Sequence, residues 1–326
     1  MGVKHYFIQL YDLLVREPKL IYKYYRPFCA GKKENKGRNI FMVDGRVGHG
    51  GMFDRLKGAI SVYAISKVQE KDFRIYFNFP FELQKYLEPN VYDWRIAPED
   101  IVYSYPHSRP LFLYGECYDP RRLFKNRRCE SHFYYGYNSL EQINTRCGTS
   151  FDWGTLYREL FKPTAYLQQY ISQYQKEIGS DYIVVHTRFL NLLGDKVETA
   201  VNPELSESEK EDLMQKMRDA IQNIIANQSS SGEETPRLML ASDSMNFIDY
   251  MQTEMSDIYV VPGTVKHIDT AGETVDAENI KMFLDYYLIS GANKVYNLVG
   301  RGMWPSAFSE YAAKIGGKIF KRIVVK

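Results

Sequence analysis

Three short stretches of the sequence place chemically active side chains directly after apolar runs. In YIVVHTR, His186 and Arg188 follow a run of β-branched residues, and in RLMLASDS, Ser242 and Asp243 follow another apolar run. An arginine guanidinium can hold two phosphate oxygens at once, and an imidazole can donate or accept a hydrogen bond. Because a cation after a buried strand needs a partner, these residue types favour the binding of a phosphate group.

The third stretch, VGRGMWPSAFSEY, joins a glycine-rich turn to the start of a predicted helix. Ser306 and Ser309 lie at that start, where free backbone N–H groups and two hydroxyls suit a phosphate. Each residue also has a purely structural alternative. Ser306 and Asp243 can cap helices, and His186 can be a core histidine bonded to a carbonyl. Their joint position at three strand ends is what favours an anion site.

Apolar periodicity predicts the elements that must position these residues. Residues 180–326 alternate between β-branched runs and amphipathic segments, which predicts a doubly wound α/β domain with a parallel sheet. The predicted strands are 182–187, 237–244, 257–263, 294–299 and 318–325. We expect the helix after the first strand to contain a capping box from Ser208 to Glu211, and the last helix, at 305–316, to have Pro305 near its first turn.

The first half contains a predicted βαβ unit, with strands at 39–44 and 72–79 around a helix at 52–69. Its turn, GRVGHGG, is neither a dinucleotide fingerprint nor a P-loop, because Phe53 replaces the third glycine and no G-K-[ST] follows. The turn can bring a backbone close to a ligand or can be a tight connection alone. Its candidate residues are Gly48, Gly50, Gly51, Asp54 and Arg55.

Composition indicates an ordinary globular chain of two domains. The 326 residues are 44% hydrophobic and 25% charged, and the net charge of +2 gives no electrostatic reason for a nucleic-acid partner. The four cysteines form no CxxC pair, which favours free thiols in a reducing cytoplasm and no metal site. No apolar run reaches the roughly 18 residues of a membrane span, and no signal peptide is recognised.

The first 38 residues differ from the rest in being aromatic and basic. We expect a segment 1–38, a first Rossmann-like domain at 39–179 that includes a closing helix at 163–179, and a second at 180–326. A basic amphipathic segment can lie on an anionic membrane surface. It can equally pack as a helix on the domain, and the sequence leaves both alternatives open.

Four motifs in order resemble the GDP-fucose-dependent fucosyltransferase superfamily, which includes α1,2-, α1,6- and protein O-fucosyltransferases and the rhizobial nodulation fucosyltransferase. GHGGMFDRLKGAISVYAISK resembles its glycine loop and first helix. VVHTRFLNLLGD resembles its H-x-R motif, and LMLASDS its strand-to-[ST]-D motif. MFLDYYLISGANKVYNLVGRGMWPSAFSEYAAKIGG resembles its last motif, and together the four span roughly residues 39–320.

The resemblance implies an α/β GT-B fold, with two facing Rossmann-like doubly wound domains. It implies inverting, metal-independent transfer of fucose from GDP-fucose to a glycan, with no cofactor. The aromatic and basic N-terminal segment adds the expectation that the acceptor is a lipid-linked polysaccharide precursor. The acceptor would lie mainly on the first domain and the nucleotide sugar on the second. We expect a cytoplasmic enzyme in polysaccharide biosynthesis, with peripheral contact to the inner membrane face through residues 1–37.

The resemblance also assigns roles at the donor site. Arg188 would hold the β-phosphate and stabilise the departing diphosphate, with His186 against the ribose or phosphates. Asp243 would contact the guanine, with support from Ser242. The phosphate and nucleoside wall would be formed by Asp285, Ser306, Ala307 and Phe308.

The general base is less defined, because this sequence departs from the family after H-x-R. Phe189 to Gly194 intervene before Asp195, a longer connection than the family's, so the role of Asp195 stays open. An inverting transfer benefits from a base on the acceptor hydroxyl, and the candidates are Glu198 and His49. The motifs also permit another GDP-sugar as donor, or a non-catalytic nucleotide- or sugar-binding protein. A sulfotransferase-like enzyme would instead bind an adenine nucleotide.

Overall fold

The computed structural model describes residues 3–25, 37–105, 107–114, 120–195, 203–229, 236–263 and 276–326. The chain divides into two compact units, the first running to Thr164 and the second beginning at Ala165. Helix α7 (Ala165–Ile178), which we expected to close the first half, packs against α10 (Asp276–Gly291) and lies in the second unit. None of the helices in these ranges is both long and apolar enough to cross a membrane.

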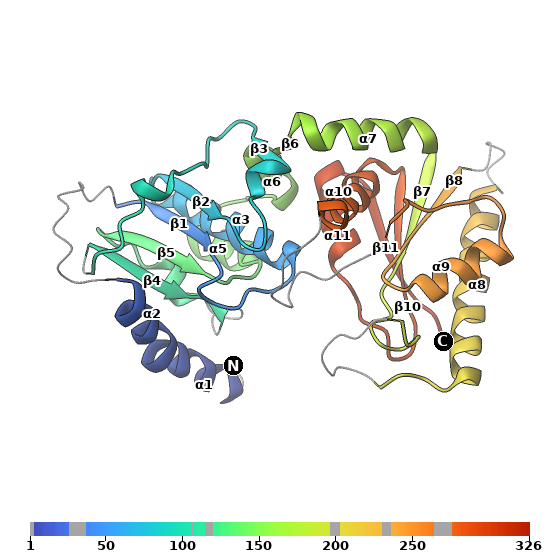
Figure 1. Cartoon of the computed structure of the whole chain (residues 1–326), viewed down its shortest axis with the longest axis horizontal. Coiled ribbons are helices and arrows are strands. Elements are labelled where there is room, and N and C mark those ends of the chain that lie inside the picture. Colours follow the sequence, from blue (N-terminus) through green and yellow to red (C-terminus); the bar gives the residue numbers. More distant parts are fainter. Residues whose placement is uncertain are drawn as a thin grey trace. The chain divides into compact units, whose positions relative to one another are not determined.

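The first unit is built on a four-stranded parallel sheet (Figure 1). Its strands, in spatial order, are β2 (Phe73–Phe77), β1 (Asn39–Val43), β5 (Glu130–Tyr134) and β4 (Ser108–Phe112). The predicted crossover is α3 (Met52–Val68), which joins β1 to β2. The remaining elements are β3 (Leu87–Pro89), β6 (Phe161–Pro163), α4 (Arg121–Phe124), α5 (Leu140–Cys147) and α6 (Trp153–Leu160), with β3 and β6 forming an antiparallel pair.

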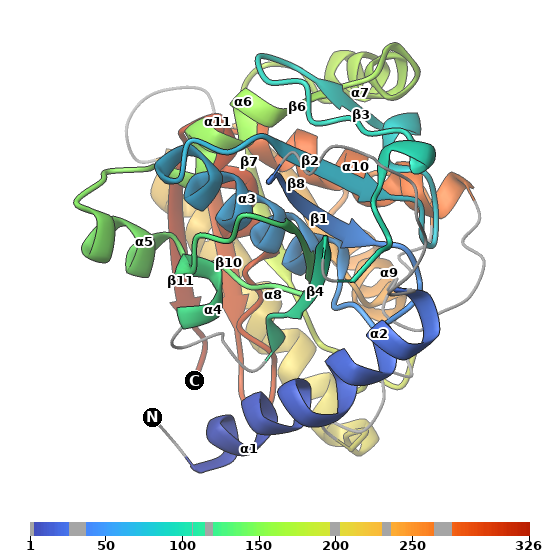
Figure 2. The same cartoon turned by 90° about the vertical axis from the view of Figure 1, so that its left-hand side faces the viewer.

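The N-terminal segment is one nearly continuous rod of helix (Figure 2). It consists of α1 (Val3–Tyr11), a π-helical turn (Asp12–Arg16) and α2 (Glu17–Tyr24). Leu20 of α2 is buried against Ile40, Met42 and Phe112, so α2 covers the sheet. The second half of the rod is therefore a packed helix, one of the two alternatives for this segment.

Glycine is required where α3 approaches the loop after β5. A Cβ atom on Gly58 would lie 2.8 Å from the ring of Phe41 and 2.9 Å from the Cα atom of Gly136. Real Cβ atoms do not approach this closely, so the pair lets the helix pack directly on the backbone. The helix N-terminus, which carries the glycine-rich turn, is thereby held at the carboxyl edge of β1.

The second unit has a five-stranded parallel sheet. In spatial order its strands are β11 (Ile319–Val324), β10 (Lys294–Val299), β7 (Tyr182–Thr187), β8 (Arg237–Ser242) and β9 (Ile258–Tyr259). Numbered by sequence within this sheet, the order is that of a doubly wound Rossmann fold, which confirms the predicted class. The order reverses between β7 and β10, and ligands of such folds bind beyond the carboxyl ends at that point.

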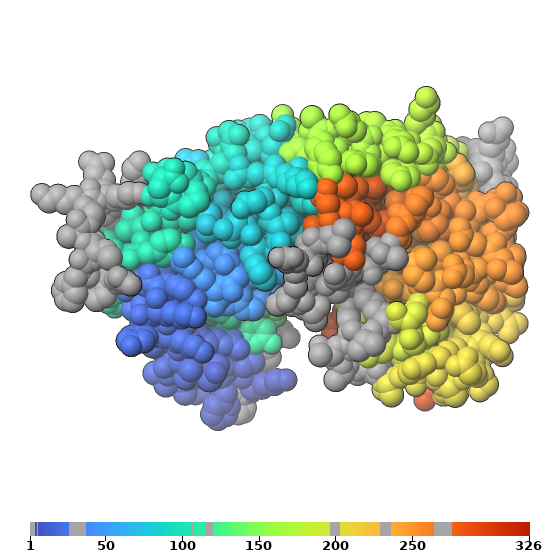
Figure 3. Space-filling view, in the orientation of Figure 1, coloured from blue at the N-terminus to red at the C-terminus, as the bar shows by residue number. Residues whose placement is uncertain are grey.

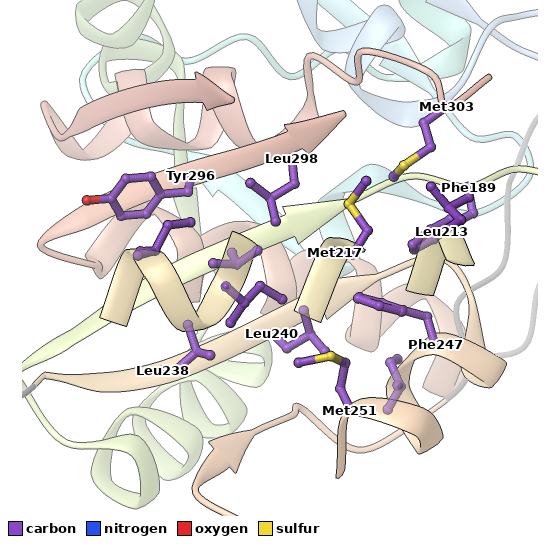
Figure 4. Close-up of a cluster of buried hydrophobic side chains, with 14 of the residues drawn as sticks. Phe189, Leu213, Met217, Leu238, Leu240, Phe247, Met251, Tyr296, Leu298 and Met303 are labelled. Atoms are coloured by element: carbon purple, nitrogen blue, oxygen red, sulfur yellow. The ribbon is translucent and has the colours of Figure 1, made fainter. Parts of the chain in front are cut away.

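Helices cover both faces of this sheet. Helices α8 (Glu207–Ser229) and α9 (Met245–Glu254) bury an apolar cluster against one face, in which Met217 and Phe247 pack with Val185 and Leu240 (Figure 4). Because side chains alternate along a strand, His186 points to the opposite face, where α11 (Phe308–Gly316) packs on β10.

Two predicted helix starts are wrong. The capping box of α8 joins Ser206 to Glu209, since the glutamate accepts both the backbone N–H (3.0 Å) and the hydroxyl (2.7 Å) of Ser206. The Ser-x-x-Glu pattern occurs twice in SESEKE, and we chose the copy from Ser208 to Glu211. The last helix begins at Phe308, after Pro305, because Ser306 turns the chain before it.

Candidate functional site

The reversal point of the second sheet brings polar side chains of three elements together. His186 of β7 lies beside Asn297 of β10 in the strand register, and the hydroxyl of Ser309 of α11 contacts the imidazole. All three are buried, and Asn297 and Ser309 have no exposed area. Polar groups at such depth need hydrogen-bonding partners, and here they supply them to one another.

The hydrogen bonds fix which nitrogen of His186 carries its proton. Arg322 of β11 donates from Nε to Oδ1 of Asn297 (2.9 Å), which orients the amide with Nδ2 toward the histidine. Nδ2 of Asn297 lies 3.3 Å from Nδ1 of His186 and 3.2 Å from its carbonyl oxygen, and the hydroxyl of Ser309 lies 3.1 Å from Nδ1. An amide nitrogen only donates, so Nδ1 accepts and Nε2 carries the proton.

Stacking on an aromatic ring orients the imidazole, and burial keeps it neutral. It stacks on Phe308 with ring centroids 5.4 Å apart and an angle of 26°, and Tyr286 meets Phe308 edge-on. Burial, and after it the nearby cations Arg188 and Arg322, lower the pKa of His186 to about 3. His186 is therefore a fixed neutral N–H donor, and positive charge at this strand end comes from Arg188.

The loop that carries Arg188 is tied to the next strand by Asp243. One carboxylate oxygen of Asp243 accepts from the backbone N–H of Phe189 (2.7 Å), and the other accepts from Leu190 (3.0 Å). The carbonyl of Arg188 accepts from the N–H of Trp304 at 3.3 Å. The arginine is half-buried, and hydrogen bonds hold its backbone from two sides. The position from which its side chain extends is therefore fixed.

The predicted serines lie in tight turns beside this loop. The hydroxyl of Ser306 accepts from the N–H of Phe308 at 3.2 Å, and Ala307 occupies the cap position of α11. The hydroxyl of Ser242 accepts from the N–H of Ser244 at 3.2 Å, and Ser244 caps α9. These serines therefore shape the turns, and their contact with a donor stays a prediction.

Two carboxylates near the site already have protein partners. Asp285 forms a buried ion pair with Lys281, with Nζ 2.6 Å from one oxygen. Burial raises the pKa of Asp285 and the ammonium group opposes that rise. Asp195 accepts from the hydroxyl of Ser244 and from the N–H of Asn246, both at 2.8 Å. Asp195 thus ties the end of the loop that follows Arg188 to the start of α9.

The other candidates lie in the first unit or outside the described residues. Arg55 donates to the carbonyls of Gly50 (2.7 Å) and Phe79 (2.9 Å), which fixes the glycine-rich turn, and Asp54 pairs with Lys57. A Cβ atom on Gly50 would lie 3.1 Å from the hydroxyl oxygen of Tyr135; Gly51 is the cap residue of α3, and Gly48 is exposed.

His49 is buried, and burial followed by Arg55 lowers its pKa to about 3. A base with this pKa is a poor match for proton abstraction near neutral pH. Glu198, the other candidate base, lies outside the described residues. Asn297 and Arg322 are not among the residues predicted from the sequence, although the amide of Asn297 inside the apolar strand KVYNLV was a signal for the first. Within the described ranges, no group of three or more His, Cys, Asp or Glu residues could hold a metal ion.

Solved structures provide the comparison that decides the fold. The NodZ α-1,6-fucosyltransferase co-crystallised with GDP matches with a TM-score of 0.55 and 15% identity, covering 85% of this chain and 91% of that one. The same enzyme soaked with GDP-fucose gives 0.52 and 15%, covering 85% and 92%. Fucosyltransferase NodZ from Bradyrhizobium gives 0.53 and 15%, covering 84% and 91%.

This chain shares the fold of NodZ. The GT-B class predicted from the four motifs is therefore confirmed. No family model and no curated protein matches the sequence.

The buried neutral state of His186 predicts a pH-dependent stability. The unfolded chain binds this proton near the ordinary pKa of 6.5, whereas the folded chain binds it only near 3. Between these values the unfolded state holds more protons, so stability falls as the pH falls. We expect His186 to account for about 2 kcal/mol of unfolding free energy lost between pH 7 and pH 5.

Urea unfolding of wild type and H186Q at the two pH values measures this contribution of His186 to the unfolding free energy. Glutamine cannot titrate, so the difference between pH 7 and pH 5 should shrink by that amount in H186Q, whatever its stability at pH 7. H107Q changes an exposed histidine and is the matched control. An equal pH dependence in wild type and H186Q would contradict the assignment.

Proposed function

We propose that this protein is an inverting, metal-independent glycosyltransferase that transfers fucose from GDP-fucose to a glycan. The observation that carries the proposal is the neutral, hydrogen-bonded His186 at the reversal point of the second sheet, with Arg188 two residues beyond it. This is where a Rossmann-like sheet binds a nucleotide. NodZ, whose fold this chain shares, was soaked with GDP-fucose in one structure and co-crystallised with GDP in another.

The chemistry of transfer follows from these two side chains. Nε2–H of His186 donates to an oxygen of the ribose or diphosphate, and its neutrality avoids a second charge close to Arg188. As the bond between fucose and GDP breaks, negative charge grows on the β-phosphate. The guanidinium of Arg188 stabilises that charge more in the transition state than in the bound donor, which lowers the barrier.

Substitution of Arg188 tests the donor site. In R188A, a charged hydrogen bond to the diphosphate is lost, so GDP should bind about 10- to 100-fold more weakly. Release of GDP from GDP-fucose should slow at least about a hundredfold. R237A removes the same charge at the opposite end of the same sheet, where β8 begins, and should retain both properties.

A thermal-shift titration identifies the donor with the same proteins. A ligand that binds the native state raises the midpoint, so GDP-fucose should give the largest rise and R188A should reduce it. The panel includes GDP-mannose, UDP, ADP and adenosine bisphosphate. A rise with an adenine nucleotide alone would refute the proposal, and binding of GDP-fucose without any release of GDP would indicate a binding protein.

We further propose Glu198 as the general base, because the low pKa of His49 makes the imidazole unsuitable. In E198Q the side chain keeps its shape but cannot take a proton. We expect hydrolysis of GDP-fucose, in which water replaces the acceptor, to fall by about 10²- to 10⁴-fold with unchanged GDP affinity.

The matched control for this substitution is E204Q. Glu204 lies six residues further along the chain and pairs with Lys210. E198Q activity equal to that of E204Q would exclude Glu198 as the base.

The N-terminal rod supports a peripheral contact with an anionic membrane. Its surface, dark blue in Figure 3, exposes large apolar side chains. The most exposed of these are Tyr6, Phe7, Leu13, Leu14 and Tyr22. Lys4, Lys19 and Lys23 are exposed on the same rod, and apolar and basic residues together favour an anionic lipid surface.

Two acidic substitutions on the rod test the membrane contact. F7E/L14E replaces two exposed apolar residues, so the fraction that sediments with phosphatidylglycerol vesicles should fall several-fold because apolar insertion is lost. V91E/I319E makes the same charge change at exposed apolar positions elsewhere and should sediment like wild type. Equal sedimentation of both variants, or none by wild type, would refute the contact.

A further inference from the structure

The first unit contains a cavity of about 580 Å³ beside the N-terminal rod. We call it the N-terminal cavity, and among the residues that line it are Arg16, Lys19, Lys23, Arg46, His49 and Tyr114. It lies between α2 and the carboxyl edge of β1, where the glycine-rich turn begins. Ligand sites of this kind commonly enclose a few hundred Å³, so the volume suits one or two sugar rings.

The charge of the lining has one sign. Four lining side chains are cationic and none is acidic. Arg16 pairs with Asp12 at 2.8 Å and Arg46 with Asp44 at 3.4 Å, but neither aspartate lines the cavity. Lys19 has no carboxylate partner in the part of the chain that the structure describes. The surplus of positive charge favours an anionic occupant.

Two lining groups are buried without hydrogen-bonding partners. Neither ring nitrogen of His49 has one among the described residues, although the side chain is only 8% exposed. The single atom Nη1 of Arg46 is also buried and lacks a partner in the same ranges. A buried polar atom without a partner costs free energy, but these atoms have almost no accessible surface, so they are not the groups that an occupant of the cavity meets. The accessible cations of the lining are Lys19 and Lys23, which are exposed, and Arg46, whose side chain is 25% exposed.

Aromatic rings complete the lining. The guanidinium of Arg46 lies between Tyr24 and Tyr103, 4.6 Å and 4.1 Å from the ring centroids, which fixes its plane. Tyr114 and Tyr135 meet edge to face at 4.9 Å and provide an apolar wall. A flat cation beside aromatic rings suits a saccharide that carries an acidic group, since the ring faces can contact C–H groups of a sugar.

A buried hydrogen-bond network fastens α2, which borders the cavity, to the sheet. The hydroxyl of Tyr25, at the end of α2, lies 2.7 Å from Nδ1 of His132 on β5. Nε2 of His132 lies 2.7 Å from Glu130, which pairs with Arg38 at 2.5 Å. All of these residues are buried, so α2 is fastened to the sheet and the cavity is built in advance of any ligand.

We propose that the N-terminal cavity is an acceptor subsite for an anionic saccharide, one that carries a carboxylate or phosphate group. Arg46, Lys19 and Lys23 bind the acidic group, and the tyrosines contact the ring. The identification as an acceptor site rests on the proposed transferase function. The carboxylate and the phosphate share the chemistry that Arg46 recognises.

Calorimetric titration of the full chain tests the inference, with methyl glucuronide, glucose 1-phosphate, methyl glucoside and inorganic phosphate as probes. At least one of the two anionic sugars should bind at least tenfold more tightly than methyl glucoside and inorganic phosphate. The one that binds identifies the acidic group. R46Q should weaken that binding about tenfold or more, whereas R109Q, which removes an exposed arginine stacked on Tyr105 outside the cavity, should not.

K19Q/K23Q is a second variant. Both lysines are exposed, so the substitutions leave the core intact, and they should also weaken binding of the anionic sugar. Equal binding of neutral and anionic sugars, or equal effects of R46Q and R109Q, would overturn the subsite. The subsite would also be overturned if phosphatidylglycerol vesicles bind wild type but not R46Q and no sugar binds. A GDP titration of the same samples separates the two proposals: loss of sugar binding with GDP binding retained refutes only the subsite.

Discussion

The interaction on which the second unit depends is the hydrogen-bonded chain through buried His186. Arg322 orients Asn297, and Asn297 and Ser309 together satisfy one nitrogen of the imidazole. The chain ties three adjacent strands to the start of α11. Displacing any member would leave a buried polar group without a partner, at a cost of about 1–3 kcal/mol. The strand ends and the helix start therefore keep one relative geometry, which a nucleotide site requires.

The same principle organises the first unit with different residues. There the buried histidine is His132, which joins Tyr25 to Glu130 and fastens the N-terminal rod to the sheet. Because α2 is held by this network and by Leu20 in the core, it is part of the domain and not an added tail. A cavity wall results on one side of α2, while α1 leaves apolar side chains in solvent.

Side chains that look like ligand contacts in the sequence also hold the frame of the site. Asp243 accepts two backbone N–H groups of the loop that carries Arg188. Asp195 closes the same connection onto the start of α9. A carboxylate in a turn satisfies free N–H groups wherever the chain reverses, so its type alone does not separate a structural role from a binding role.

The sequence by itself determined the alternation of strands and helices, the parallel sheet of the second unit and the strand ends at which His186 and Arg188 stand. These follow from local periodicity, which each segment carries independently of the others. Only the tertiary structure decided that α7 belongs to the second unit, that Asn297 and Arg322 complete the histidine network, and that His49 is buried. The partners of those residues are distant in the chain, and burial depends on what packs around a side chain, so no local pattern encodes them.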